Sequence, residues 1–211
     1  MESSQIIDLL TLIIQQYEPS LMPYLKEIEA RTGTCSLRPG DRFPPPGQSL
    51  RQAAYLAQGV FRVYSVDETK EEKIVRLPSE GDFTMRLAAY HDIRPNVEYY
   101  WEALTDASLL TWQHEDMEYL ARTVPNWYSM TVAITQRILL QLAVERAEMF
   151  NDDATLRYQK FVERYPSVAA RVPLRYVASY LGIAPQSLSR IRQHLGKQCD
   201  IALGQQQLDN K

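Results

Sequence analysis

The chain has 211 residues, of which 45% are hydrophobic, and a formal net charge of −3. This length and composition are typical of a soluble protein with one large domain or two modest ones. No apolar run approaches the roughly 18 residues that a membrane span needs. The N-terminus also lacks the positive region and the apolar core of a signal peptide. We therefore expect a cytoplasmic protein without a membrane partner.

The sequence contains no recognisable carrier of catalysis. Two cysteines, Cys35 and Cys199, are too few for a disulfide framework, a four-cysteine zinc site or a cysteine-ligated iron–sulfur cluster. The three histidines show neither HxH nor HExxH spacing, and phosphate-binding loops and dinucleotide fingerprints are absent. We expect no enzymatic activity, no metal and no catalytic residue. A β-barrel enzyme of the cupin kind, the alternative for a β-rich chain, would need clustered metal ligands.

Positive charge is concentrated near the C-terminus. Residues 1–155 hold 14 Lys and Arg against 23 Asp and Glu, a net of −9. Residues 156–197 hold eight basic residues against Glu163 alone, a net of +7. Phosphate contacts supply most of the non-specific affinity of DNA-binding proteins, so this segment is a candidate DNA-binding region. A basic face that is merely solvated is the alternative.

In chain order, the first elements are a short helical start and a β unit. Apolar residues recur at helical spacing over 6–14 and 21–28, and this region is expected to end near Gly33. From 36 to 112, short apolar runs alternate with turns rich in Pro, Gly and Asp, which predicts a mostly antiparallel β-sandwich or roll. The expected strands are Ala54–Ala57, Val60–Val66, Lys73–Leu77 and Leu109–Trp112.

A long helix is predicted over 126–150, which contains neither Pro nor Gly. The helix is apolar over more of its circumference than packing on one side requires. We expect one apolar face to pack on the β unit and the other to contact a second copy of the chain. The alternative is a helix buried wholly within its own chain. The dimer interface is assigned to Met130, Ile134, Ile138, Leu142 and Met149, and the other apolar face carries Val132, Leu139, Ala143 and Phe150.

The segment after the long helix has the pattern of a helix-turn-helix. Asn151–Asp153 is a candidate N-cap for a helix over 154–165, which Pro166 ends. In 172–195, Ala178 supplies a small residue where two helices cross, and Gly182 can adopt the positive φ of the turn. Pro185 suits the first turn of the second helix. The inward apolar positions are Val177, Leu181, Ile183, Leu188 and Ile191. An αα-hairpin that never contacts DNA is the alternative.

The second helix is expected to enter the major groove with its N-terminal outward residues facing the bases. Arg190 can donate two hydrogen bonds to guanine, and Gln186 can pair with adenine, while Ser189 lies on the same face. Phosphate contacts are expected from Arg171, Arg175, Ser187 and Arg192.

The order of these parts resembles the Crp/Fnr family of bacterial transcription regulators over essentially the whole chain, and a branch common in Bacteroidetes in particular. The resemblance implies an α+β fold: an antiparallel β-roll like that of cyclic-nucleotide-binding domains, flanking helices, a long dimerisation helix and a C-terminal winged helix-turn-helix. The family's recognition helix often carries Glu, Ser and Arg, and here Gln186 replaces the Glu. The residues that carry the resemblance are Leu37–Gly40, Gly59–Tyr64, Glu80–Phe83, Arg157-Tyr158, Tyr165-Pro166, Arg171–Pro173, Ala178–Ile183 and Leu188–Arg192.

The cyclic-nucleotide cassette of this family is not kept. Where the family has Gly-Glu and Arg-Ser or Arg-Thr pairs, an ungapped overlay places Met85-Arg86 and Val97-Glu98. A carboxylate at the phosphate position would repel the ligand, so cyclic AMP is not expected to bind. Another small effector is a further option, with a degenerate pocket lined by Arg86, Tyr99 and Trp101. The alternative is that these aromatic residues are simply core.

Together these features predict a homodimeric DNA-binding transcription regulator that acts on a two-fold symmetric operator. Its partners are double-stranded DNA and a second copy of the chain, with RNA polymerase as a further candidate, and no cofactor is expected. The competing hypothesis is a small-molecule or protein-interaction sensor module whose helix-turn-helix does not read DNA. The expected domains are 1–125 for the helices and β-roll, 126–150 for the dimerisation helix, 151–198 for the helix-turn-helix, and a disordered tail at 199–211.

Overall fold

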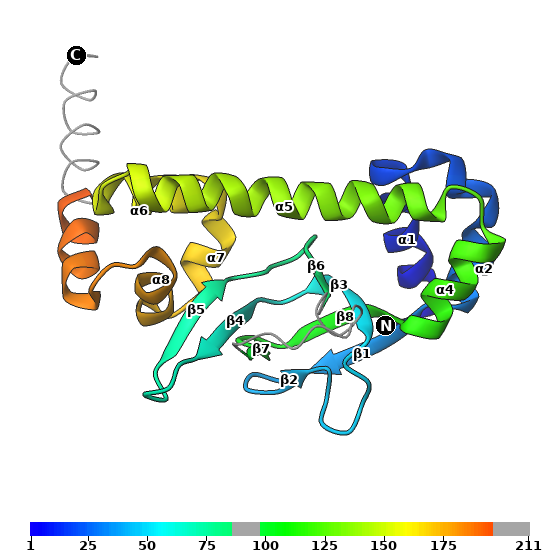
Figure 1. The fold of residues 1–211 in the computed structure, drawn as a ribbon, viewed down its shortest axis with the longest axis horizontal. Coiled ribbons are helices and arrows are strands. Elements are labelled where there is room, and N and C mark those ends of the chain that lie inside the picture. The colour runs from blue at the N-terminus through cyan, green and yellow to red at the C-terminus, as the bar shows by residue number, and fades with distance from the viewer. Residues whose placement is uncertain (86–97, 196–211) are drawn as a thin grey trace, which may run out of the picture. The chain divides into compact units, whose positions relative to one another are not determined.

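The computed structural model of the chain describes residues 1–85 and 98–195. The chain divides into two compact units, Met1–Glu145 and Arg146–Lys211. The long helix α5 (Trp127–Asn151) begins in the first unit and ends in the second (Figure 1). It matches the predicted helix to within one residue at each end. The predicted tail at 199–211 lies outside the described residues, as does the segment after 195 in which a wing would be sought.

The first unit contains two four-stranded antiparallel sheets, which confirms the predicted α+β fold with a β-roll. The first sheet has the order β1 (Gly33–Leu37), β8 (Ala107–Gln113), β3 (Gln52–Gln58) and β6 (Phe83–Met85). The second has the order β2 (Arg42–Phe43), β7 (Tyr99–Ala103), β4 (Phe61–Val66) and β5 (Glu72–Arg76). The four expected strands correspond to β3, β4, β5 and β8.

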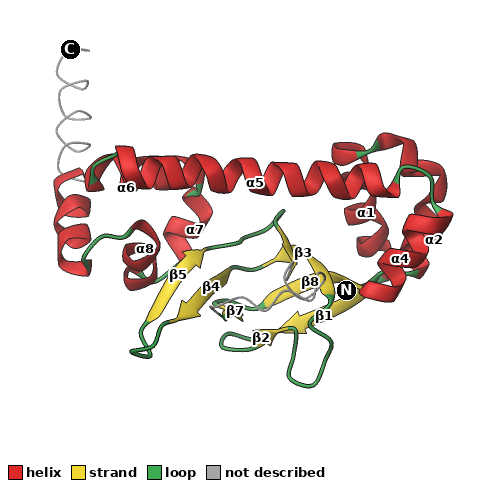
Figure 2. Cartoon of the chain, in the orientation of Figure 1, coloured by secondary structure: helices red, strands yellow, loops and turns green. Residues whose placement is uncertain are grey.

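Besides α5, four helical segments accompany the sheets in the described part of the first unit. The predicted helical start consists of α1 (Ser3–Tyr17), a 3₁₀ segment η1 (Pro19–Tyr24) and α2 (Leu25–Ala30). Helix α4 (His114–Thr123) follows β8 directly and was not predicted. Figure 2 shows α1, α2 and α4 gathered at one end of the sheets. The two prolines of η1 explain why this stretch forms a tighter turn instead of continuing α1.

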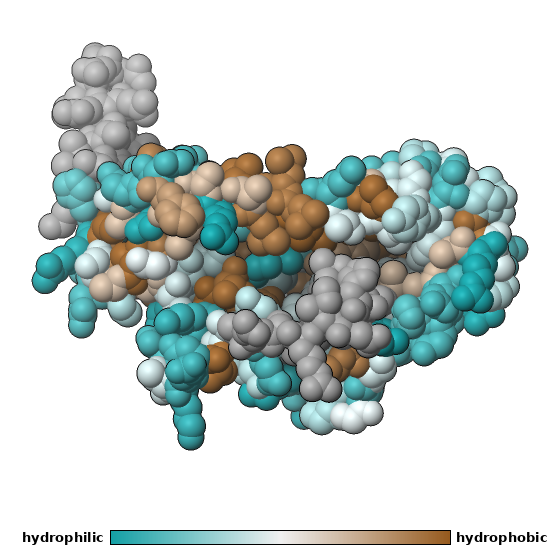
Figure 3. Space-filling view, in the orientation of Figure 1, coloured by the Kyte–Doolittle hydropathy of each residue, from teal (hydrophilic) through white to brown (hydrophobic). Residues whose placement is uncertain are grey.

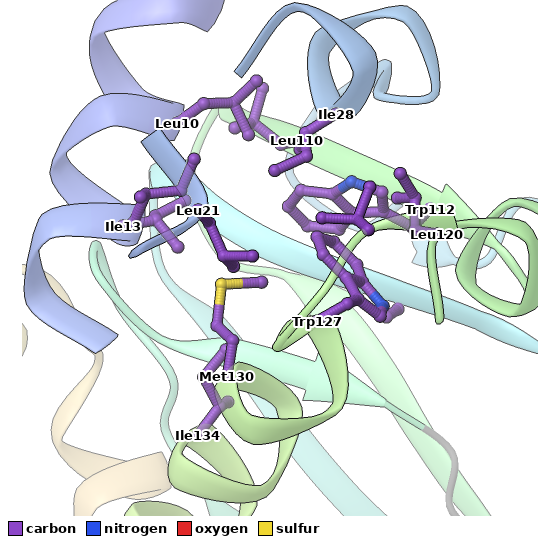
Figure 4. Packing of buried hydrophobic residues seen from close by; sticks show 13 residues of the cluster. Leu10, Ile13, Leu21, Ile28, Leu110, Trp112, Leu120, Trp127, Met130 and Ile134 are labelled. Carbon is purple, nitrogen blue, oxygen red and sulfur yellow. The ribbon is translucent and has the colours of Figure 1, made fainter. Parts of the chain in front are cut away.

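Alternation along β3 gives the first sheet two different apolar faces. Ala54 and Leu56 face the second sheet and form an inner core with residues such as Phe61. Ala53 faces away from the second sheet and belongs to a larger core made with the helices. Figure 4 shows this helical core, in which side chains from α1, η1, α2, β8, α4 and α5 converge: Leu10, Ile13, Leu21, Ile28, Leu110, Trp112, Leu120, Trp127, Met130 and Ile134.

The structure corrects the predicted dimer interface on α5. Met130 and Ile134 are only 5% and 8% exposed because they are part of the helical core, so a second chain cannot reach them. Ile138 packs against the same core, and Leu142 is half-buried. Met149, in the second unit, is 37% exposed, so its assignment to an interface stays a prediction. Periodicity identifies two apolar faces correctly, but it does not tell which one the chain itself covers.

The face of α5 that points away from the helical core is exposed. Leu139 and Leu140 are 55% and 68% exposed, and Val144 is 44% exposed. Tyr128 and Phe150 are also exposed, and Val132 is half-buried. Figure 3 shows the resulting apolar surface along the middle of the helix. Apolar side chains at this spacing on a solvent-facing helix are typical of an interface.

A buried arginine organises the outer face of the second sheet. Arg62 donates from Nε to Glu102 Oε1 at 3.0 Å and from Nη2 to Glu102 Oε2 at 2.9 Å, a two-pronged pair across β4 and β7. It also donates to Glu72, and its guanidinium lies 4.2 Å from the centre of the Tyr64 ring. The Arg62 side chain is 8% exposed, so these contacts satisfy a charge that solvent does not reach.

We predict that Arg62→Met destabilises the first unit by about 3 kcal/mol, because it leaves the Glu102 carboxylate partly buried without its partner. Urea denaturation followed by tryptophan fluorescence measures this, since all three tryptophans lie in the first unit. The double variant Arg62→Met/Glu102→Leu removes both charges and should lose less stability than the single variant. A double variant that is less stable than the single one would contradict this account of the pair.

Candidate DNA-binding site

The second unit is helical throughout its described residues. After the end of α5 come α6 (Ala154–Arg164), α7 (Pro166–Arg171), α8 (Leu174–Leu181) and a helix over 185–195. Asp153 caps α6 as predicted, because its Oδ1 accepts a hydrogen bond from Leu156 N at 2.9 Å. Pro166 ends the preceding helix and begins α7 at its first position, where a missing N–H has no cost.

The turn between α8 and the next helix forms a Schellman motif. Gly182 has φ +62° and donates its N–H to Ser179 O at 3.2 Å, while Ile183 N donates to Ala178 O at 2.9 Å. These two bonds satisfy carbonyls at the end of α8 and require the left-handed conformation that glycine adopts without strain. The predicted role of Gly182 in the turn is therefore confirmed.

The two helices around this turn share a small core. Ala178 is fully buried, as expected for the residue at the helix crossing, and Leu188 is fully buried on the second helix. The remaining buried apolar residues of the second unit are Phe161, Val168, Val172, Val177, Leu181 and Ile183. Ile191 is half-buried. This core fixes which side of the helix over 185–195 faces outward.

The outward face of the helix over 185–195 carries the predicted base-reading residues. Gln186 and Arg190 lie four residues apart, on the side opposite the buried Leu188, and both are exposed together with Ser189. Sequence reasoning did not single out Gln193, which lies three residues beyond Arg190 on the same face and is also exposed. The period of 3.6 residues, applied one turn further, would have identified it.

The predicted phosphate-contacting residues are all exposed. Ser187 and Arg192 are exposed on the second helix, and Arg171 and Arg175 are exposed before and on α8. Arg175 donates to Tyr176 OH at 3.1 Å and lies over that ring. Arg171 donates to Ser167 Oγ at 2.6 Å, which orients its guanidinium at the end of α7.

Part of the basic charge of this segment is used within the unit. Arg164 makes a two-pronged ion pair with Glu148, with distances of 2.9 and 2.6 Å, and Lys160 donates to Asp152 at 2.7 Å. The hydrogen bond from Arg164 lowers the pKa of Glu148 below its usual value. Within the described residues, the arginines without a carboxylate partner in this region include Arg175, Arg190 and Arg192. The cations left for phosphate are thus fewer than the sequence count suggests.

The structure places the predicted effector residues only in part. Arg86 lies outside the described residues, as does Val97, so two of the four positions compared with the cyclic-nucleotide cassette are not described. Trp101 packs against the inner core between the sheets, and Tyr99 is 39% exposed at the start of β7. Among the described residues, no group of three His, Cys, Asp or Glu side chains is arranged to hold a metal ion. None of the helices in the described ranges is long and apolar enough to cross a bilayer.

We predict that Gly182→Ala destabilises the helix-turn-helix by about 1–2 kcal/mol, because a Cβ disfavours the left-handed backbone. Gly182→Asn should cost less, since asparagine adopts this conformation more readily. Hydrogen exchange of the backbone amides in 174–195 reports the local stability of both variants. Unchanged exchange in the alanine variant would show that the turn does not depend on a positive φ.

Comparison with known proteins identifies the fold. No family model matches the sequence, and a search of curated proteins finds no match either. FixK2 from Bradyrhizobium japonicum is similar in structure with a TM-score of 0.66 and 16% identity, over 79% of this chain and 85% of that one. CLP, a c-di-GMP-responsive global regulator of Xanthomonas campestris, gives a TM-score of 0.58 and 14% identity, over 82% and 91% of the two chains. A protein of Eubacterium rectale that is assigned to the Crp/Fnr family gives a TM-score of 0.60 and 14% identity, over 84% of each chain. The chain therefore has the fold of these Crp/Fnr-type structures, with a β-roll, a long helix and a helix-turn-helix.

Proposed function

We propose that the protein is a DNA-binding transcription regulator that acts as a homodimer on a two-fold symmetric operator. The observation that carries this proposal is the outward face of the helix over 185–195, with Gln186, Ser189 and Arg190 exposed opposite a buried Leu188. Side chains of this kind on the N-terminal half of a recognition helix reach base edges in the major groove. The fold shared with FixK2 and CLP supports the same function.

In this proposal the site separates base reading from backbone binding. The Arg190 guanidinium grips the O6 and N7 atoms of a guanine, and Gln186 pairs with an adenine edge. The DNA backbone is held by four exposed residues, Arg171, Arg175, Ser187 and Arg192. The described residues of the second unit carry eight Arg and Lys against four Asp and Glu, a net of +4, whereas the sequence before them is acidic. Attraction to phosphate therefore favours this unit for DNA contact.

The exposed face of α5 provides the second half of the proposal. Leu139, Leu140 and Val144 are each more than 40% exposed, and burying them against the same face of another copy would remove this apolar surface from water. A two-fold axis between such helices pairs identical surfaces and presents two recognition helices to the DNA. The regulator is proposed to work in the cytoplasm, without cyclic AMP as its effector and with RNA polymerase as a candidate partner.

We predict different effects for the loss of Arg190 and Arg175. Arg190→Ala should weaken binding to the specific operator by about 1–3 kcal/mol and relax discrimination at one base pair in each half-site. Arg175→Ala should weaken all duplexes alike and reduce the slope of log affinity against log salt by about one for each phosphate that is no longer neutralised. Fluorescence anisotropy on a duplex selected from a random pool, and on its scrambled counterpart, measures both effects at several salt concentrations.

Arg122→Ala is the matched control for this experiment. It removes one exposed arginine from α4 in the first unit, where its partner is Glu118, and should leave DNA binding unchanged. If Arg190→Ala weakens specific and scrambled duplexes equally, then 172–195 is not the base-reading element. If the wild type shows no salt-dependent binding to any duplex, the chain is an interaction module whose helix-turn-helix serves packing only.

We also predict that Leu139→Glu/Leu140→Glu converts the dimer to a monomer, because it places four charges in a two-fold interface. Sedimentation velocity at micromolar concentration measures the mass, and circular dichroism verifies that the fold is retained. Leu12→Glu is the control, since Leu12 is 59% exposed on α1 and lies outside the proposed interface. A wild-type protein that sediments as a monomer would exclude the dimer and the two-fold operator together.

A further inference from the structure

A cavity in the first unit lies outside the inner core of the β-roll. It has a volume of about 120 Å³ and is lined by residues of the helices α1, α2, α4 and α5, of the first sheet, and by Arg76 of β5 in the second sheet. Its walls include Leu10, Ile13, Ala53, Trp112, Trp127 and Ile134, all of them residues of the helical core in Figure 4 or of the strand beneath it. Phe61 and Trp101, which pack between the two sheets, are not among the described residues that line the cavity.

The walls of the cavity are apolar except at a few positions. Arg76 of β5 is the one charged side chain among the described lining residues. Thr131 and Thr135 also line the cavity, but their hydroxyls donate to the carbonyls of Tyr128 and Thr131 on α5, each at 2.8 Å. A threonine hydroxyl that already donates its proton to a carbonyl can accept a hydrogen bond from a ligand but cannot donate one to it. Thr84 of β6 is a further polar residue of the wall, and Arg76 is the described lining residue that brings a positive charge to an acidic group.

From this arrangement we propose that the cavity binds a small monocarboxylate with a linear apolar body of about five or six carbons, its carboxylate held by Arg76. The apolar body replaces empty space against leucine, isoleucine and tryptophan side chains, and the guanidinium supplies a two-pronged partner for the carboxylate. The proposal does not depend on DNA binding, because every residue in it belongs to the first unit.

The volume limits the size of the ligand. A cavity of about 150 Å³ lined by similar side chains holds one benzene ring. A slightly smaller cavity holds an alkyl body of similar size. Hexanoate meets this limit, whereas acetate would leave most of the apolar wall without a contact. Because each buried methylene is worth about 0.8 kcal/mol in transfer, affinity should rise about fourfold for each one added.

The carboxylate of Asp82 interacts electrostatically with Arg76 and offers a second way to test the site. Burial raises the pKa of Asp82, whereas Arg76 and Arg137 act in the opposite direction. Asp82 Oδ2 accepts a hydrogen bond from Ser79 N at 2.9 Å, and Asn at this position keeps an acceptor for that bond. Removing its negative charge should favour an anionic ligand, which makes Asp82→Asn a variant with the opposite sign to Arg76→Gln.

The test is calorimetric titration of the full chain with butyrate, pentanoate, hexanoate and the uncharged analogue hexanol. We expect affinity to increase about fourfold per methylene from butyrate to hexanoate. Arg76→Gln should weaken hexanoate about tenfold and leave hexanol unchanged. Asp82→Asn should tighten hexanoate about two- to fivefold. Lys73→Gln is the matched control, because it removes a cation of the same strand that pairs with Asp67 and does not line the cavity.

A brominated ligand locates the site directly. Trp112 and Trp127 line the cavity and Trp101 does not, so 6-bromohexanoate should quench much of the tryptophan emission. Trp127→Phe should reduce the quenched fraction without abolishing binding. Failure of hexanoate to bind saturably at millimolar concentration would overturn the proposal. It would also be overturned if Arg76→Gln and Lys73→Gln weakened hexanoate equally, or if bound 6-bromohexanoate left the emission unchanged.

Discussion

The packing of one face of α5 into the helical core is the constraint on which the rest of the first unit depends. Trp127, Met130 and Ile134 occupy this core together with Trp112 and the helices at the N-terminus. Once they are buried, the orientation of the helix about its own axis is fixed. Leu139 and Leu140 are then largely exposed, and Leu139 also lines the cavity together with Thr135 and Ile138.

The helix-turn-helix could be predicted from the sequence because its determinants are local. Gly182, Pro185 and Ala178 each have a conformational or steric requirement that lies within a few residues, and the structure shows each of them in the expected place. The apolar spacing then fixes which residues of the second helix point outward. Gln193 was not predicted to lie on the outward face, because that face was followed for too few turns. The pairing of Arg164 with Glu148 could not be foreseen, since it joins residues 16 positions apart on different helices.

The sheets and the orientation of α5 were harder to predict from the sequence than the helix-turn-helix. Strands β3, β4 and β8 contain runs of buried apolar residues, which the sequence displays directly. Strands β1 and β2 are mostly exposed or very short, and their strand geometry comes from pairing with β8 and β7, so composition alone does not mark them. The two apolar faces of α5 are alike in the sequence. Only the position of Trp112 and the N-terminal helices decides between them, and that is a tertiary property.

The two edge strands of the second sheet, β2 and β5, are unsuited to pairing with a strand of another molecule. Strand β2, at one edge, has two residues, and Phe43 at its end is followed by Pro44, Pro45 and Pro46, which have no N–H to donate. Strand β5, at the other edge, has charged residues on both sides of Ile74 and Val75: Glu72, Lys73 and Arg76. Both edges are poor templates for a foreign strand, because one lacks donors and the other would bury charges. The second sheet therefore resists growth into fibrils by strand addition at either edge.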